Sequence, residues 1–313
     1  MSLSSLYNKC CPRRLWPWLF LLAGFAPLVA QAQFGGGYGG GGFGGGGRRG
    51  GRGGGFGGGG GRAYVIRDED DLKMIEEMEK SLDPAFAEDV FSVTRLMYNS
   101  GGMGYGRGRF WDDDTPDSDL NLGFRMYQAT SMKMHPGYNY IHITPEELSK
   151  YPFVYLAAPD NMNLSDAELK ALRAYLLNGG FLMAEDFWGD QSWSVVYQQF
   201  KRIFPDRQPV ELPLTHPIFH CVFDFKYKAQ MPSVNSWTRN GMRYDYADYS
   251  TDHDPHYYAI NDDKGRMMCI ICRNNHYGDG WEHEGDDHSY FDVFSMPQAY
   301  PMFINITYYA MTH

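Results

Sequence analysis

The sequence predicts an α/β fold with a mostly parallel sheet, and two observations in the centre of the chain support this prediction. Short apolar runs at 153–158 and 181–184 are typical of strands that are buried on both faces. Each run is followed by a segment with helical periodicity, at 165–177 and at 192–204. Strand–helix–strand–helix at this spacing is a βαβ unit with a right-handed crossover, which places helices on both faces of a parallel sheet.

The central helices have clear boundaries. Ser165 occupies a cap position, and Glu168 follows three residues later as in a capping box. Asn178-Gly179-Gly180 ends this helix with residues that tolerate positive φ. The predicted inward-facing residues of the two helices are Leu169, Leu172, Leu176 and Leu177, and then Val195, Val196, Phe200 and Ile203.

The segments before this centre predict a helical lead-in at 63–89 and the start of a domain at 90–313. Leu72, Ile75, Met78 and Leu82 of the lead-in recur at helical spacing and should share one buried face. The later apolar runs alternate as in strands. Thr144 followed by Pro145 then marks another helix start. In chain order, the expected elements are a helix at 71–82, a strand at 91–98, a loop at 103–119, a helix at 120–130 and a strand at 138–143.

The segments after the centre predict strands at 217–225 and 266–272, and a closing helix or strand at 302–311. Cys269 and Cys272 lie three residues apart in the second of these strands, so their thiols should point to opposite faces of the sheet. We therefore expect two free buried thiols here and no redox-active pair.

The composition is that of a globular protein, with 43% hydrophobic, 21% charged and 16% aromatic residues. This excludes a collagen, a coiled coil and a wholly disordered chain. Residues 63–313 hold all 38 acidic residues and 21 of the 28 basic ones, which gives a net charge of −17. A general nucleic-acid binder needs a basic face, so we expect no nucleic-acid partner.

The first 32 residues have the features of a secretory signal peptide. Lys9, Arg13 and Arg14 precede an apolar run at 15–29, and Ala30-Gln31-Ala32 is a cleavage site. The run is shorter than the roughly 20 residues of a membrane span. We therefore expect an exported bacterial protein, periplasmic or extracellular, without a transmembrane span after cleavage.

Residues 33–62 are predicted to be a disordered tether. They contain 21 glycines and four arginines and no acidic residue, so they cannot repay the entropy of ordering a backbone. Deleting them should leave the melting temperature of the protein unchanged. The alternative is an arginine- and aromatic-rich tail that contacts anionic lipid, glycan or nucleic acid.

Four stretches resemble a bacterial family known as domain of unknown function 4159 (DUF4159). They are YPFVYLAAPDNMNLSDAELKALRAYLLNGGFLMAEDFWGD, KRIFPDRQPVELPLTHPIFH, GDGWEHEG and PMFINITYYAMT, in this order along the chain. The family is similar to the class I glutamine amidotransferase-like superfold, which includes trehalose-utilisation-like proteins. The resemblance implies a flavodoxin-like three-layer sandwich with a mostly parallel sheet, and it implies no established activity.

The resemblance places a functional elbow at 185–190, directly after the strand at 181–184. Amidotransferases carry a nucleophilic cysteine at this elbow, whereas this chain has Glu185 and Asp186 there and no cysteine between Cys11 and Cys221. The absence of a thiolate argues against amidotransferase activity. Carboxylates at the carboxyl edge of a sheet can act as a base, a metal ligand or an acceptor for a sugar hydroxyl, or can simply cap a solvated helix start.

Three sets of candidate site residues follow from these patterns. The acidic segment 276–288 mixes imidazoles with carboxylates, which suits Zn²⁺, Mn²⁺ or Fe²⁺, although such a loop can also be merely solvated. A similar loop at 252–256 is a weaker candidate. The sets are catalytic Glu185, Asp186 and His216, ligand-binding Trp188, Asp190, His276 and Glu282, and metal-binding His283, Asp286 and His288.

The sequence supports two main functions. The first is an exported envelope protein whose domain, without amidotransferase activity, is a ligand-binding or assembly module for an unknown small molecule, a sugar or an envelope protein. The alternative is a carboxylate-dependent or metal-assisted hydrolase or isomerase that acts on a sugar or cell-wall fragment. No cofactor is required by the first, and a divalent cation is the one expected for the second. A scaffold with a purely structural elbow is a third possibility.

Overall fold

The computed structural model describes residues 69–86, 89–100, 110–245 and 250–313. The predicted signal peptide at 1–32 and tether at 33–62 lie outside these residues. The strands are β1 (Thr94–Met97), β2 (Asn139–His142), β3 (Phe153–Ala157), β4 (Phe181–Glu185), β5 (Val210–Glu211), β6 (His256–Asn261) and β7 (Met267–Arg273). The α-helices are α1 (Glu69–Lys80), α2 (Asp117–Ala129), α3 (Pro145–Leu148), α4 (Asp166–Leu177), α5 (Gly189–Ile203), α6 (Val234–Asn240), α7 (Tyr277–Glu282), α8 (His288–Tyr290) and α9 (Tyr300–Thr312).

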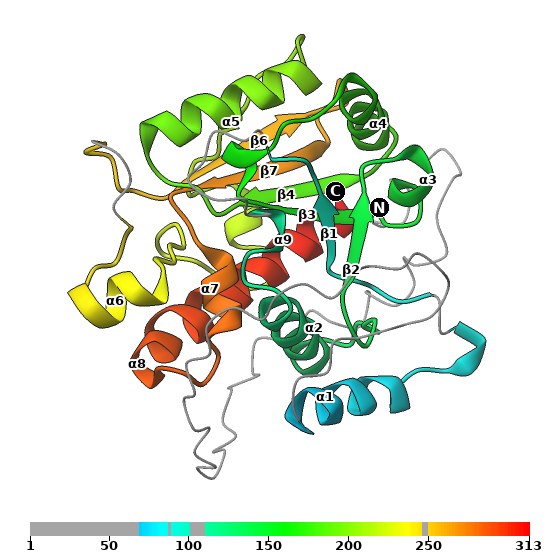
Figure 1. The fold of residues 1–313 in the computed structure, drawn as a ribbon, viewed down its shortest axis with the longest axis vertical. Helices are drawn as coiled ribbons and strands as arrows, with labels where there is room; N and C mark the ends of the chain where they lie inside the picture. Colours follow the sequence, from blue (N-terminus) through cyan, green and yellow to red (C-terminus); the bar gives the residue numbers. More distant parts are fainter. Residues whose placement is uncertain (1–68, 87–88, 101–109, 246–249) are drawn as a thin grey trace, which may run out of the picture. The chain divides into compact units, whose positions relative to one another are not determined.

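The seven strands form one sheet in the order β2-β1-β3-β4-β7-β6-β5. The first five run parallel, and β6 and β5 continue the sheet in antiparallel pairing. Figure 1 shows these strands crossing the middle of the molecule between two groups of helices. The predicted α/β fold with a mostly parallel sheet is therefore confirmed.

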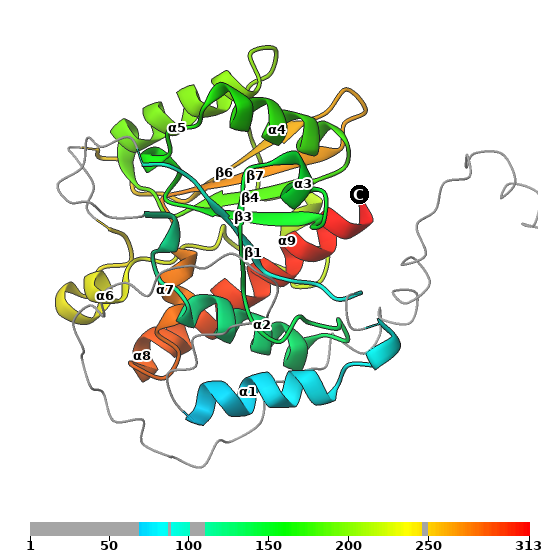
Figure 2. The same ribbon diagram turned by 45° about the vertical axis from the view of Figure 1, so that its right-hand side comes forward.

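The two faces of the sheet are covered by different helices. On one face α4 and α5 bury Leu172 and Phe200 against Leu182 of β4. On the other face α2, α7 and α9 lie together, and α9 buries Phe303 against Phe153 of β3. Figure 2 shows α4 and α5 above the sheet and α9, α7 and α2 below it.

Strand β7 crosses this layered core in the middle of the sheet, and all seven of its residues are buried. Cys269 belongs to the apolar cluster under α4 and α5, whereas Cys272 belongs to the cluster under α9. Both thiols are free. The predicted divergence of these two cysteines is confirmed.

The central helix signals are also confirmed, with two exceptions. The Ser165 side chain accepts a hydrogen bond from the Glu168 amide, and the Glu168 side chain accepts one from the Ser165 amide. Gly179 has a φ of 111° where α4 ends. However, Leu177 and Val195 are exposed rather than buried, because each lies about 100° around its helix from its buried neighbour, Leu176 or Val196.

The strand predicted at 217–225 is wrong. Residues Pro217–Phe219 form a short 3-10 helix, and the chain then turns. The backbone amides of Val222 and Phe223 donate to the Asn305 side chain of α9, so a side chain replaces the strand ladder as their hydrogen-bond partner. The segment predicted at 302–311 as a helix or strand is the helix α9.

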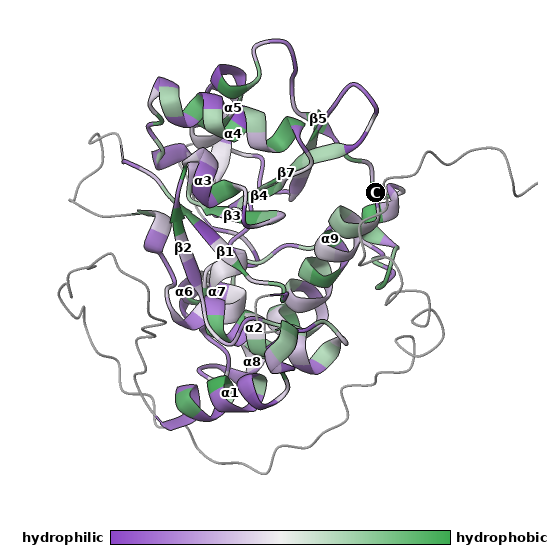
Figure 3. Cartoon of the chain, turned by 90° about the vertical axis from the view of Figure 1, so that its right-hand side faces the viewer, coloured by the Kyte–Doolittle hydropathy of each residue, from purple (hydrophilic) through white to green (hydrophobic). Residues whose placement is uncertain are grey.

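The expected helix in the lead-in is present as α1, which buries Ile75 and Met78 and packs against α2. Leu72, predicted on the same face, is exposed. In Figure 3, α1 carries both hydrophilic and hydrophobic residues, as expected for a helix that covers a core with one face only. Among the described residues, no helix combines the length and the apolar character needed to cross a membrane.

Candidate functional site

Strained backbone marks the carboxyl edge of the parallel strands. Ala158 follows β3 with a φ of 45°, Asp186 follows β4 with a φ of 66°, and Asn274 follows β7 with a φ of 56°. Asp114, in the segment between β1 and α2, has a φ of 61°. Such conformations are unfavourable for residues other than glycine and concentrate at functional sites. This edge is also where open α/β sheets bind ligands.

Glu185, at the end of β4, is fully buried and joins neighbouring segments of this edge through hydrogen bonds. Its Oε1 accepts a short hydrogen bond from the Tyr155 hydroxyl, and its Oε2 accepts one of 2.7 Å from the Tyr277 amide. Burial raises the pKa of Glu185 to about 7, although His276 opposes this shift. The structure therefore places Glu185, a predicted catalytic residue, beneath the site with both oxygens engaged.

Asp186 is the elbow residue that faces the site. Its side chain is 13% exposed, and its Oδ1 lies 3.5 Å from Nε2 of His276. Burial, together with the nearby Glu185 and Asp114 carboxylates, raises its pKa well above the usual value against the effect of His276. The structure thus places the elbow carboxylate beside a histidine, His276, which the sequence analysis selects as a ligand-binding residue.

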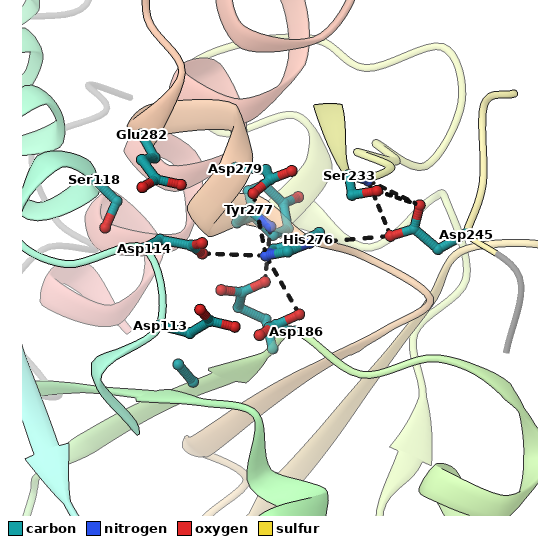
Figure 4. Close-up of polar contacts among 12 residues, drawn as sticks. Asp113, Asp114, Ser118, Asp186, Ser233, Asp245, His276, Tyr277, Asp279 and Glu282 are labelled. Atoms are coloured by element: carbon teal, nitrogen blue, oxygen red, sulfur yellow. Dashed lines mark hydrogen bonds and ion pairs between the residues drawn. The ribbon is translucent and has the colours of Figure 1, made fainter. Parts of the chain in front are cut away.

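Four carboxylates surround His276, which begins α7. Its Nε2 lies 3.1 Å from Oδ2 of Asp114 and 3.5 Å from Oδ1 of Asp279, and its Nδ1 lies 3.9 Å from Oδ2 of Asp245. Figure 4 shows these acidic side chains and Asp186 converging on the imidazole. Burial lowers the pKa of His276, but the carboxylates outweigh burial and raise it well above the usual value.

Asp113 and Asp114 complete this group, and they are the functional candidates that the sequence analysis missed. Arg95 of β1 holds their segment, because it donates to the Asp113 carbonyl at 2.8 Å and to the Ser118 hydroxyl at 2.7 Å. Burial raises the pKa of Asp113, and Asp114 adds to the shift. Burial also acts to raise the pKa of Asp114, but the nearby His276 outweighs burial and holds that pKa below the usual range. The signal available in the sequence was the run Asp112-Asp113-Asp114 after a predicted strand.

A second group of ligand-type atoms lies at the other end of α7. His283 Nε2 is 3.1 Å from Oε2 of Glu282 and 3.6 Å from Oδ1 of Asp279, and His283 Nδ1 is 2.8 Å from Oδ2 of Asp286. Burial opposes protonation of His283, but Glu282 and Asp279 raise its pKa to about 10. Burial raises the pKa of Asp279 to about 6.

The remaining predicted residues lie apart from these two groups. His216 caps the 3-10 helix at Pro217–Phe219 and packs on Tyr309 near the end of α9, which in Figure 2 runs away from α7. Asp190 is exposed, and hydrogen bonds from Ser250 and Arg273 hold its pKa below the usual value.

Trp188 is buried at the start of α5, and His288 is exposed at the start of α8. His256 of the 252–256 loop contacts Asp252 and Glu211 and forms part of strand β6. None of these described contacts joins these residues to His276 or Asp186.

Within the part of the chain that the structure describes, two sets of side chains have ligand atoms close enough together to share one metal ion. The first is Asp113, Asp114 and His276, with Asp186 and Asp279 beside it. The second is Asp279, Glu282 and His283. Imidazole nitrogen combined with carboxylate oxygen suits Zn²⁺, Mn²⁺ or Fe²⁺ better than Ca²⁺, which prefers oxygen alone.

Comparison with known proteins gives one family. The family model described as "Domain of unknown function (DUF4159)" matches residues 93–311, a range that contains every residue of both groups. No curated protein matches the chain.

Proposed function

This chain belongs to the DUF4159 family, and from the geometry of its site we propose that it is a divalent-cation-dependent ligand-binding module of the bacterial envelope. The cation is held by Asp113, Asp114 and His276, whose ligand atoms lie close enough together to share one ion, and Asp186 beside them supplies a further carboxylate. The observation that carries the proposal is the spacing around His276 Nε2, which lies 3.1 Å from Asp114 and 3.5 Å from Asp186. Two ligand atoms that are each about 2.1 Å from one ion are about 3.0–3.4 Å apart, so little movement is needed to bind one.

The position of the group supports the same proposal. The five parallel strands follow the order β2-β1-β3-β4-β7, which corresponds to the flavodoxin-like order 2-1-3-4-5. In such folds ligands bind where the strand order reverses, between the first and third strands, and the Asp113–Asp114 segment follows β1. We propose on this basis that the domain is a flavodoxin-like sandwich related to the class I glutamine amidotransferases, with Asp186 at the nucleophile position.

A bound cation would give an acidic site a ligand preference. Without a cation, the carboxylates repel anions and share protons with His276. With one, the site presents a Lewis acid ringed by hydrogen-bond acceptors, which suits a polyhydroxylated ligand such as a sugar. Export by a signal peptide, as the sequence predicts, would place this module in the envelope among such ligands.

Calorimetric titration of the metal-stripped full chain tests the proposal. We expect Zn²⁺ or Mn²⁺ to bind, and we expect Asp186→Asn to lose the cation held by His276 while its circular dichroism spectrum is unchanged. Asp263→Asn is the matched control, because it removes the same charge from an exposed residue that pairs with Arg207. An Asp186→Asn variant that binds like the wild type, or a wild type that binds no cation, would disprove the proposal.

A metal-assisted hydrolase that acts on a sugar or cell-wall fragment is the second candidate. The observation that favours it is the position of Asp279, which lies between His276 and His283. Metal-bound water is a nucleophile at neutral pH, and a pair of cations can hold both the nucleophile and the leaving group. Incubating the Zn²⁺-loaded protein with muropeptides and weighing the products by mass spectrometry tests this candidate. If the mass of the muropeptides is unchanged, the hydrolase candidate is wrong and the binding module remains the proposed function.

A further inference from the structure

We propose that α7 carries a second divalent-cation site, formed by Asp279, Glu282 and His283, and that Asp279 bridges it to the first. This inference rests on the proposed function, because the other cation of the pair is the one that the proposed function places at His276. The ligand is a second Zn²⁺ or Mn²⁺ ion, and the result is a two-cation centre.

The short helix α7 positions all of these groups. His276 stands at its N-terminal end and His283 at its C-terminal end. Asp279 and Glu282 are three residues apart, so both lie on one face of the helix between the two imidazoles. About two turns of backbone therefore carry two nitrogen and two carboxylate ligands.

Asp279 is oriented as a bridging ligand. Its side chain is buried, and its Oδ2 accepts a hydrogen bond of 2.5 Å from the Val234 amide. Its Oδ1 lies 3.5 Å from Nε2 of His276 and 3.6 Å from Nε2 of His283. These separations are long for hydrogen bonds but close to the distance between two atoms that bind one cation. Oδ1, the oxygen of Asp279 that does not accept the Val234 hydrogen bond, thus lies between the two sites.

His283 is also arranged as metal-ligating histidines usually are. Its Nδ1 is 2.8 Å from Oδ2 of Asp286, so this outer carboxylate leaves Nε2 to face the inner oxygens. In His276 the Nε2 also faces the inner oxygens, whereas Nδ1 lies 3.9 Å from Oδ2 of Asp245, which is beyond hydrogen-bond distance. Asp245 is itself held by the Ser233 amide and hydroxyl, as Figure 4 shows. An outer carboxylate such as that of Asp286 fixes the tautomer and the direction of a ligating imidazole.

The number of cations bound per chain tests the inference. The metal-stripped full chain is loaded with Zn²⁺, passed through gel filtration and measured by inductively coupled plasma mass spectrometry. We expect two Zn²⁺ per wild-type chain, one in His283→Ala and one in Asp186→Asn. His142→Ala is the matched control, because His142 is an exposed histidine on the edge strand β2, and it should leave two.

The outcomes separate the two proposals. One Zn²⁺ in the wild type that is lost in Asp186→Asn and kept in His283→Ala overturns the second site and leaves the first. One Zn²⁺ that is lost in His283→Ala and kept in Asp186→Asn overturns the first site and the bridge. No bound Zn²⁺ overturns both.

A milder variant covers the case in which His283→Ala does not fold. Asp286→Asn keeps every proposed ligand but removes the outer carboxylate of His283. We expect about 10–100-fold weaker binding of one cation and unchanged binding of the other, as for other outer carboxylates. Equal affinities for both cations in the wild type and this variant would show that Asp286 does not orient a ligand and would count against the second site.

Discussion

Arg95 and Asp119 form an ion pair in which each side chain is only 1% exposed. Arg95 Nε lies 2.9 Å from both carboxylate oxygens, and the other nitrogens of the guanidinium bind the 111–118 segment that carries Asp113 and Asp114. The pair joins β1 to α2 and sets the position of two carboxylates of the site. A purely structural contact thus determines part of the functional geometry.

Asp119→Asn should destabilise the protein strongly, because it leaves the Arg95 charge buried without a counter-charge. The expected loss is about 3–5 kcal/mol in the free energy of unfolding, measured by urea denaturation. Asp206→Asn is the control, since the Arg173–Asp206 pair lies at the surface and its loss should leave the urea denaturation curve nearly unchanged. Equal losses in the two variants would contradict the buried-pair argument.

The Asp186→Gly variant should be more stable than the Asp186→Ala variant. Both variants remove the carboxylate, but the φ of 66° at this position suits glycine and disfavours alanine. We expect Asp186→Gly to exceed Asp186→Ala by about 1 kcal/mol in unfolding free energy. An alanine variant as stable as the glycine variant would mean that the elbow relaxes out of the left-handed conformation.

The protein should tolerate glutamine at position 185 better than leucine. Glutamine can accept from the Tyr277 amide through its oxygen and donate to the Tyr155 hydroxyl through its nitrogen. Leucine leaves the buried Tyr277 amide without its partner, which costs about 1–3 kcal/mol. Thermal and urea denaturation of both variants measure the difference. Equal stability would show that Glu185 does not organise the strand edge.

Gly278→Ala should weaken cation binding without removing a ligand. A Cβ at Gly278 would lie 1.8 Å from Oδ2 of Asp114, the oxygen that faces His276, so the carboxylate must move away. We expect about 10–100-fold weaker binding by calorimetry, the range found when a supporting group is lost. Gly123→Ala is the control, because a Cβ there meets no atom within 4 Å. Unchanged affinity in Gly278→Ala would contradict the role of Asp114.

The three described cysteines should react with iodoacetamide according to their burial. Burial raises the pKa of Cys221 to about 11, so its thiolate is about one part in a thousand at pH 8 and rises about tenfold per pH unit below 11. Cys269 and Cys272 should stay unmodified in the native protein and react fully in denaturant. Peptide mapping by mass spectrometry measures this. A Cys269–Cys272 disulfide would contradict their placement on opposite faces of β7.

The layered core could be predicted from the sequence because its signals are local. The capping box at Ser165, the glycine pair after α4 and the apolar runs of β3 and β4 each lie within a few residues, and each is confirmed. The predicted strand at 217–225 failed because its amides bind Asn305, some 80 residues away. A local sequence pattern cannot reveal a hydrogen-bond partner that lies so far away along the chain.

The candidate site was only partly predictable, for the same reason. Asp186 and His276 were identified from their place after a strand and in an acidic loop, and the structure brings them to 3.5 Å. His216, which the sequence also predicts as a catalytic residue, packs on Tyr309 instead. Asp114 was missed, because its role depends on Arg95 folding its segment back over the strand ends.

The groups around His276 come from segments that are far apart along the chain. A break in the exposed turn after α5 would leave Asp114 and Asp186 on one fragment and His276, Asp279 and His283 on the other. Neither fragment could then assemble the cluster alone, and β4 and β7, which pair side by side, would be divided between the two. Recovery of metal binding on mixing the halves would report their reassembly into one sheet, so the same geometry makes this domain a natural split reporter.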